Sequence, residues 1–413
     1  MRRICFIAAL ILLLCRVAMA EEVKNYTLDI SKVNQEASNL HVKCSFSLDF
    51  QDKDSVSMNF GGGQEFSIDN LNINSGDFEY ELHRESKSIV FRKVSSQKIS
   101  VSMAYNYTNL SSFFIYGKGD AELWETSFGE YFYPYVPNTF MDVALNAETP
   151  DSLSLICSYP LDSGDTTKYS GKLNHILSQS LTLAFIRDEA YQRTDEYIPG
   201  KLSIYQIKDM QCGRERYEEL LVLTQAAIVF FGKVYGEDYI SAERNVTALP
   251  VYLFHNGEGF SNRYNIGFIS ASQEKFSTKP DIYPLMHEIG HRWLGEWTLL
   301  IDDGQPGAYF IKETLNEFMT LMFIRYVCGN AYYETQLDWC QSEYEKIKGT
   351  PQDEPVVNVV TNNNNTVIYR KGPLALIRIA EQIGYGELMS VISGFYKAVS
   401  YTHLRAHETL RHL

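Results

Sequence analysis

Residues 21–208 alternate apolar and polar side chains, which is the period of a β-strand with one buried face. The clearest run is residues 99–105, ISVSMAY, and shorter runs of the same period occur at 41–50, 79–94 and 153–157. No stretch of about twelve residues in this part of the chain shows the 3.6-residue period of a helix. The pattern therefore predicts an N-terminal antiparallel β-domain.

Helical spacing of the apolar side chains begins after this part. Residues 214–234 predict an amphipathic helix, and residues 372–383 predict another one later in the chain. Two short apolar runs, at 250–254 and 266–269, predict strands. We therefore expect a second, mainly helical domain over residues 209–399.

Residues 284–297, PLMHEIGHRWLGEW, combine a helical pattern with metal chemistry, and Asp281 suits the N-cap. His287 and His291 are four residues apart, so a helix places both imidazoles on one face, where they can bind one Zn²⁺. Glu288 is turned by about 100° from His287 and can reach water at the metal without being a ligand. A pattern of three residues also occurs by chance, so this stretch alone leaves zinc binding and coincidence open.

A catalytic zinc site usually has three protein ligands and one open position, so a third ligand is needed. The next helical run, residues 309–327, is closed by Gly329 and carries Glu313 and Glu317. A turn at 304–307 would bring Glu313 back toward the two histidines. Glu317 could accept a hydrogen bond from a ligand imidazole, or could itself be the third ligand. A solvated helix face is the simpler interpretation of this glutamate pair.

The sequence HEIGHRWLG followed by KETLNEFM resembles the gluzincin aminopeptidases, the family of membrane alanyl aminopeptidase and leukotriene hydrolase. The family pattern is H-E-x-x-H-x-W-x-G, about eighteen residues, then E-G-x-x-E-[YF]. The matching residues are His287, Glu288, His291, Trp293, Gly295, Glu313, Glu317 and Phe318. Here 21 residues separate His291 from Glu313, which implies a longer connecting loop. The resemblance favours Glu313 over Glu317 as the third ligand.

Two further blocks bear on this resemblance. Residues 369–372, YRKG, are similar to the family's Y-E-K-G, whose tyrosine donates a hydrogen bond to the tetrahedral intermediate. The family's exopeptidase motif, G-x-M-E-N, has its best counterpart at residues 261–269, SNRYNIGFI. Tyr264 stands there in place of the glutamate that binds the free amino group of the substrate. Exopeptidase specificity and an endopeptidase activity of the thermolysin type therefore both stay open.

The resemblance implies a multidomain α+β enzyme in which a thermolysin-like zinc peptidase domain follows the β-domain. It implies one Zn²⁺ per chain, held by His287, His291 and Glu313, with Glu288 as general base toward a zinc-activated water and Tyr369 at the oxyanion. The expected activity is that of an aminopeptidase-like zinc metallopeptidase acting on peptides or proteins. A non-catalytic peptide-binding module on this scaffold would be expected to lose one of these five residues, and all five are present.

Both ends of the chain carry separate predictions. Residues 1–20 predict a signal peptide, with an early arginine pair, an apolar run and an A-x-A cleavage site. An uncleaved anchor is the alternative, although the run is short for a membrane span. We expect a secreted or periplasmic protein without a transmembrane segment after signal removal. Residues 400–413 lose the preceding pattern, so we expect a non-native tail and a natural protein that continues past residue 399.

Net charge and cysteine content restrict the partners and the disulfides that the protein can have. The net charge of −14 disfavours nucleic acid and anionic membranes as partners. Five of the seven cysteines follow the predicted signal peptide. Cys328 and Cys340 could form a disulfide in an oxidising compartment. Because five is an odd number of cysteines, at least one must stay a free thiol, which we expect to be buried and inert. The aromatic stretch 124–134 either lines the cleft or packs between domains.

Overall fold

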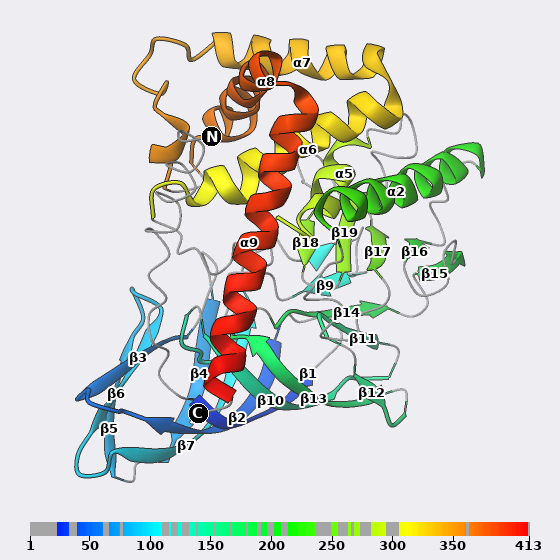
Figure 1. Cartoon of the computed structure of the whole chain (residues 1–413). Helices are drawn as coiled ribbons and strands as arrows, with labels where there is room; N and C mark the ends of the chain where they lie inside the picture. Colours follow the sequence, from blue (N-terminus) through cyan, green and yellow to red (C-terminus); the bar gives the residue numbers. More distant parts are fainter. Residues whose placement is uncertain are drawn as a thin grey trace. The chain divides into compact units, whose positions relative to one another are not determined.

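The chain is described by a computed structural model (Figure 1). The described residues are 23–32, 39–60, 66–74, 77–109, 115–116, 123–125, 132–137, 139–151, 153–159, 161–165, 167–178, 181–187, 191–195, 202–207, 214–236, 249–254, 263–265, 268–272, 282–294, 305–360 and 363–411. They group into two compact units, one within residues 18–212 and 244–278 and the other within 213–243 and 279–413. The predicted signal peptide lies outside the described residues, and the domain boundary expected at residue 209 stays a prediction.

The largest sheet of the first unit has seven strands among the described residues. Its order is β12 (Asp162–Ser163), β13 (Lys168–Leu177), β10 (Phe140–Glu148), β1 (Val23–Lys32), β2 (Asn39–Asp49), β7 (Lys98–Asn109) and β4 (Phe66–Ile73). The predicted alternation is realised in β2, where every second side chain is buried. One buried face carries the core, in which the rings of Tyr26 and Phe46 stack with centroids 5.3 Å apart.

The prediction of an antiparallel domain is wrong at one strand pair. β1 and β10 run parallel, with Tyr26 opposite Val143 and Ser31 opposite Glu148. The sheet is therefore mixed. Alternating side chains show which face of a strand is buried, but they carry no information about the direction of a neighbour more than a hundred residues away.

Two smaller sheets complete the β-rich part. One contains β3 (Ser55–Asn59), β6 (Ser88–Lys93) and β5 (Phe78–His83), and the other contains β11 (Leu153–Cys157), β14 (Leu183–Arg187), β9 (Leu123–Glu125) and β8 (Ile115–Tyr116). Within the predicted aromatic stretch, Phe132 and Tyr133 are fully buried, and the Tyr133 hydroxyl donates a 2.7 Å hydrogen bond to the carbonyl oxygen of Ser178. These two rings belong to the core of this unit.

A fourth sheet carries the counterpart of the exopeptidase motif. Its order is β15 (Tyr191–Asp195), β16 (Leu202–Ile207), β17 (Leu249–Phe254), β19 (Phe268–Ser272) and β18 (Arg263–Asn265). The strand predicted at 266–269 lies two residues later, in β19. β18 is an edge strand antiparallel to β19, with Tyr264 opposite Ile269. Tyr264 therefore lies on an edge strand that precedes the H-E-x-x-H sequence in the chain.

The second unit is helical over its described residues. It contains α2 (Arg214–Tyr235), α5 (Tyr283–Gly290), α6 (Leu315–Phe323), α7 (Asn330–Glu345), α8 (Gly372–Ile383) and α9 (Tyr385–Arg411), with a 3₁₀ turn η5 (Val356–Asn358). Three π-helical segments occur as well, namely η3 (Phe310–Thr314), η4 (Ile324–Cys328) and η6 (Val367–Lys371). Figure 1 shows η3, α6 and η4 as one continuous helical stretch, which ends at Gly329 with a φ of 96°. Left-handed backbone of this kind favours glycine.

The predicted helix boundaries are confirmed in two places and corrected in a third. α2 and α8 match the predictions for 214–234 and 372–383. The helix that carries the H-E-x-x-H sequence ends at Gly290, inside the stretch 284–297 in which the pattern indicated a helix, and its N-cap is Ile282 instead of Asp281. The backbone N–H of His291 still donates to the carbonyl oxygen of His287, so helical geometry extends one residue past α5.

Aromatic side chains join α2 to the residues just after the H-E-x-x-H sequence. The rings of Phe231 and Trp293 stack with centroids 5.6 Å apart, and the Trp293 indole N–H donates a 3.2 Å hydrogen bond to the carbonyl oxygen of Gly236. Trp293 is 3 % exposed, so its ring is core and its match to the family pattern has a packing role. This contact holds the residues just after α5 against α2.

Cys328 and Cys340, whose pairing the sequence left open, are both free thiols. Burial raises the pKa of each thiol to about 11. The described backbone continues as helix through residue 411, and the non-native origin of residues 400–413 stays a prediction. Among the helices that the structure describes, none has the length and apolar character that a membrane crossing requires.

Candidate metal centre

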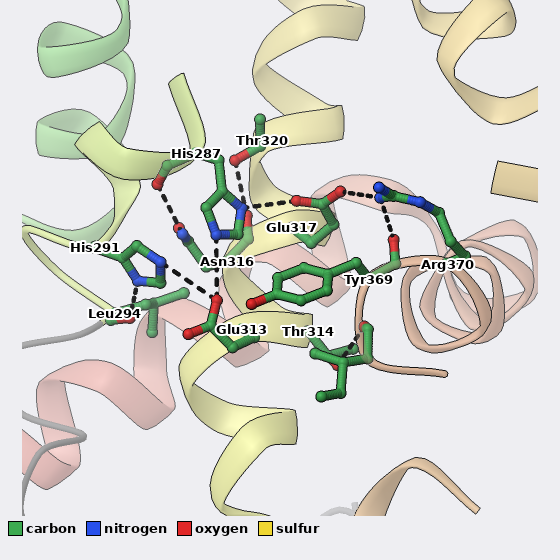
Figure 2. Close-up of polar contacts among 11 residues, drawn as sticks. His287, His291, Leu294, Glu313, Thr314, Asn316, Glu317, Thr320, Tyr369 and Arg370 are labelled. Atoms are coloured by element: carbon green, nitrogen blue, oxygen red, sulfur yellow. Dashed lines mark hydrogen bonds and ion pairs between the residues drawn. The ribbon is translucent and has the colours of Figure 1, made fainter. Parts of the chain in front are cut away.

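The two histidines and one glutamate that the sequence singled out converge on one point (Figure 2). The Nε2 atoms of His287 and His291 lie 3.2 and 3.3 Å from the same Oε2 atom of Glu313. One donor atom from each residue lies within 4.8 Å of the other two. Both histidines come from α5 and the residue that follows it, and Glu313 comes from η3, so a short helix and a π turn build the site.

The donor set and its spacing fit a zinc ion. Imidazole nitrogen and carboxylate oxygen are borderline-soft and hard donors that Zn²⁺ takes at about 2.0–2.1 Å. Two ligands at that distance in a tetrahedron are about 3.3 Å apart, which matches the two N–O separations found here. Three protein donors also leave one tetrahedral position for another ligand. His287, His291 and Glu313 are therefore the residues that would hold the ion.

Close helix packing places the two elements that carry the ligands. The Asn316 side-chain amide donates a 2.8 Å hydrogen bond to the carbonyl oxygen of His287, which ties α6 to α5. Gly290 lies where the two helices approach, and a Cβ atom there would collide with the Asn316 amide. The glycine inside the H-E-x-x-H sequence is therefore needed for the approach of α6.

A second tie links the turn that carries Glu313 to the turn that carries Tyr369. The Thr314 hydroxyl donates a 2.7 Å hydrogen bond to the carbonyl oxygen of Ile368, and both groups are buried. Gly372 packs against Thr314 so closely that a Cβ atom at Gly372 would collide with it. Glu313 and Tyr369 both lie in π turns, which often occur at functional sites.

Glu317 supports the site instead of lining it. Its Oε2 atom lies 2.7 Å from Nδ1 of His287, on the ring edge opposite the nitrogen that faces Glu313. Its Oε1 atom accepts a 2.8 Å hydrogen bond from the Arg370 guanidinium. The side chain is 3 % exposed. Glu317 therefore has the position of a residue that orients the ligand His287, and it does not have the position of a third metal ligand.

The two residues predicted to act on the substrate lie beside this cluster. Glu288 is partly buried on α5. Burial lowers the pKa of His291, and the Glu313 charge outweighs it and raises that pKa, with a smaller contribution from Glu288. The Tyr369 ring lies edge-on to His287 with centroids 5.8 Å apart. Figure 2 shows its hydroxyl directed toward Glu313. Burial, followed by the Glu313 charge, raises the pKa of Tyr369 well above its ordinary value, so the hydroxyl keeps its proton.

The electrostatics of the cluster favour a cation. Burial lowers the pKa of His287, but hydrogen bonds with Glu313 and Glu317 outweigh it and raise the pKa to about 10. Burial raises the pKa of Glu313, and the charges and hydrogen bonds of His291 and His287 bring it well below its ordinary value. The buried carboxylates thus create a negative potential that protons or a metal ion can neutralise.

The structure brings together most of the predicted site residues and adds others. His287, His291, Glu313 and Tyr369 form one cluster, with Glu288 beside it. Asn316 and Arg370 were not singled out from the sequence. Asn316 lies three residues after Glu313 in the same helical stretch, and Arg370 adjoins Tyr369. In the sequence, only their closeness to the motif residues could have indicated a role at the site. The Tyr264 side chain lies outside the described residues.

Comparisons with solved structures agree with this arrangement. No family model and no curated protein sequence matches the chain. Its structure is similar to that of leukotriene A4 hydrolase from Saccharomyces cerevisiae, with a TM-score of 0.66 and 13 % identity, over 92 % of this chain and 62 % of that one. It is also similar to an M1 zinc metallopeptidase from Deinococcus radiodurans, with a TM-score of 0.63 and 12 % identity, over 92 % and 88 %.

These similarities establish the fold. The chain has the architecture shared by leukotriene A4 hydrolase and the M1 zinc metallopeptidases, in which a β-rich region precedes a helical region. The chain spans 62 % of the length of the yeast hydrolase structure.

Proposed function

We propose that this chain is a zinc metallopeptidase that hydrolyses peptide bonds in peptides or proteins, with one Zn²⁺ per chain and an aminopeptidase-like activity. One observation carries the proposal: His287, His291 and Glu313 bring three donor atoms within 4.8 Å of one another, and both histidine Nε2 atoms lie 3.2–3.3 Å from the same Glu313 oxygen. The fold of the M1 zinc metallopeptidases supports it. Export from the cytoplasm, suggested by residues 1–20, is part of the same proposal.

The chemistry divides between the ion and the side chains. When bound, Zn²⁺ supplies Lewis acidity that polarises a scissile carbonyl group and makes water acidic enough to lose a proton near neutral pH. Glu288 accepts the proton of the attacking water as a C–O bond forms, and it delivers that proton to the amine nitrogen as the C–N bond breaks. Tyr369 donates a hydrogen bond to the oxygen of the carbonyl group as negative charge develops on it.

The mode of cleavage has a second candidate. In the resemblance, a glutamate on the edge strand binds the free amino group of the substrate, and Tyr264 occupies that place on β18. Tyrosine offers no negative charge to an ammonium group. This observation favours an endopeptidase of the thermolysin type as the alternative to an aminopeptidase, with the same zinc chemistry.

The proposal is tested by zinc content and peptide hydrolysis of the purified chain. We expect about one zinc per chain and cleavage of a panel of fluorogenic peptides that is lost on chelation. Glu288→Gln is the matched control, because it keeps the shape of the side chain and all three ligands. It should bind zinc normally and lose at least ~10²-fold in kcat, the scale of general-base catalysis.

Two outcomes would contradict the proposal. If the wild-type chain binds no zinc, the proposed metal site is wrong. If the zinc-loaded wild-type chain cleaves no peptide and is as inactive as Glu288→Gln, a non-catalytic peptide-binding module on the same scaffold is favoured.

A further inference from the structure

We propose that Arg370 is a positioning residue for the metal centre, which acts on His287 through Glu317 and on Tyr369 through its backbone. The inference rests on the proposed function, since it assigns a role in the same site. Arg370 stands second in YRKG, where the family pattern has a glutamate, so the resemblance supplies no role for it.

The guanidinium of Arg370 is held from three directions. Its carbon lies 3.7 Å from the centre of the Trp339 ring on α7, which is the stacked geometry of a cation–π contact. One nitrogen, Nη1, donates a 2.8 Å hydrogen bond to Oε1 of Glu317 and another of 2.8 Å to the carbonyl oxygen of Tyr369. The side chain is 19 % exposed. Figure 2 shows it on the far side of Glu317 from His287.

Glu317 carries the effect of Arg370 to the histidine. With Oε1 bound to Arg370, the carboxylate presents Oε2 to Nδ1 of His287 at 2.7 Å. A carboxylate paired with a guanidinium accepts hydrogen bonds and donates none, so it keeps the ring proton on Nδ1. Once His287 loses its second proton, as metal binding requires, the lone pair is on Nε2, the atom that faces Glu313. Arg370 therefore sets both the rotation of the ring and the nitrogen that is available to a metal.

The pairing also makes a buried Glu317 tolerable. A carboxylate that is 3 % exposed and has no cationic partner is costly, because burial strips its water. Removing Arg370 would leave His287 as the remaining ion-pair partner of Glu317. With a metal on a neutral His287, the carboxylate would bear that cost unless it rotated or water entered. Either change moves Oε2 away from His287.

The bond to the Tyr369 carbonyl couples the same side chain to the proposed oxyanion donor. Tyr369 lies in the π turn η6, one residue before Arg370, and its ring lies edge-on to His287. A single guanidinium thus supports a proposed metal ligand and the tyrosine together. Loss of Arg370 should reduce metal affinity and the rate of the chemical step at once.

The test uses zinc affinity, read by competition with a chromophoric chelator, together with kcat and KM. Arg370→Met should weaken zinc binding by roughly 10–100-fold, the usual effect of losing a partner that orients a ligand. It should lower kcat more than it changes KM. Arg370→Lys keeps a charge without the planar fork, and a loss of about three- to tenfold is expected for it. Arg378→Met, which removes an exposed arginine on α8, is the matched control and should bind zinc within about twofold of wild type.

A double variant separates positioning from general stability. Because Arg370 acts through Glu317, Arg370→Met combined with Glu317→Gln should lose no more zinc affinity than the worse single variant. A purely structural role would lower the melting temperature of the metal-free protein and leave the zinc Kd unchanged. Should Arg370→Met not fold, Arg370→Lys and Glu317→Gln carry the same comparison.

Zinc Kd values of Arg370→Met and Arg370→Lys within threefold of wild type would overturn the inference and leave the zinc site standing. Additive losses in the double variant would also overturn it. Wild-type chain that binds no zinc would overturn the proposed function, and this inference with it.

Discussion

The side-chain amide of Asn316 holds the backbone carbonyl of His287 at 2.8 Å, and the bond is buried between α5 and α6. It joins the turn of helix that carries one proposed ligand to the helix that follows another. Gly290 makes the approach possible, because any larger side chain would meet the Asn316 amide. The geometry of the centre thus depends on a residue with no side chain at all.

Gly290→Ala is expected to destabilise the protein by about 2 kcal/mol, as overpacking of a closed interface does. The added methyl group must displace Asn316 and break its bond to His287, so zinc affinity should fall as well. Gly394→Ala is the control, since Gly394 lies in α9 with no atom near its Cβ position. Alanine there should be neutral or stabilising by about 0.5–1 kcal/mol. Equal melting temperatures for the two variants would contradict this account.

The assignment of the third ligand can be separated from its support. Glu313→Ala should abolish stoichiometric zinc, because its Oε2 atom lies between both Nε2 atoms. Glu317→Ala should retain zinc with an affinity about 10–100-fold lower, since Glu317 contacts the other nitrogen of His287. Metal content after dialysis against a buffered zinc solution measures both. If Glu313→Ala keeps its full zinc content and Glu317→Ala loses it, the third ligand is Glu317, one helical turn later.

Tyr369→Phe should keep the fold and the zinc and lose about 10²–10³-fold in kcat, the range for removal of one oxyanion donor. The ring edge against His287 is retained, so packing should change little. KM is expected to stay within a few-fold, because the lost hydrogen bond is stronger in the transition state than in the ground state. Steady-state kinetics with one fluorogenic peptide measures this. A rise in KM with unchanged kcat would instead give Tyr369 a role in ground-state binding.

The identity of residue 264 predicts how the enzyme treats a free amino terminus. Tyr264 offers no carboxylate, so the charge-assisted hydrogen bond that would contribute ~1.5–3 kcal/mol, or roughly 10–150-fold, is missing. A free ammonium group is therefore expected to be preferred over an acetylated one by roughly tenfold or less. The measurement is kcat/KM on a matched pair of peptides, free and N-acetylated. A preference of about a thousandfold would require another acidic residue to hold the amine, as in a strict aminopeptidase.

Cys44 should resist thiol reagents in the native protein. It is 3 % exposed, and burial raises its pKa to about 12, with hydrogen bonds to Tyr26 and Tyr105 opposing the shift. At pH 8 a thiol with that pKa is ionised in roughly one molecule in ten thousand, and the thiolate is the reactive form. Mass spectrometry after brief labelling with a maleimide, before and after denaturation, tests this. Native labelling of Cys44 as fast as that of a free thiol would show that the sheet opens readily.

Local patterns predicted the elements well, and the reasons are physical. Apolar spacing and a closing glycine located α2, α8 and the stretch that ends at Gly329, because each of these signals acts within a few residues. The spacing of His287 and His291 predicted adjacent imidazoles for the same reason. The helix that carries them ends at Gly290, which is also the place where α6 packs closely.

What the sequence did not predict depends on distant partners. The parallel pairing of β1 with β10 joins segments more than a hundred residues apart. Arg370 reaches Glu317 across 53 positions and rests on a tryptophan from a third helix. Such contacts produce no periodic pattern in a single sequence. A lone arginine beside a motif therefore cannot be recognised from the sequence as either solvated or buried in a network of contacts.

The central place of β1 in its sheet bears on the order of events during synthesis. β1 lies between β2, which follows it at once, and β10, which ends at residue 148. At about ten residues per second, a ribosome needs roughly ten seconds to pass from β1 to the end of β10. Over that interval the nascent chain can pair β1 with β2 and β2 with β7, but the other edge of β1 has no native partner. A strand edge left open for that time is a binding site for a chaperone or for a second nascent chain on the same messenger RNA.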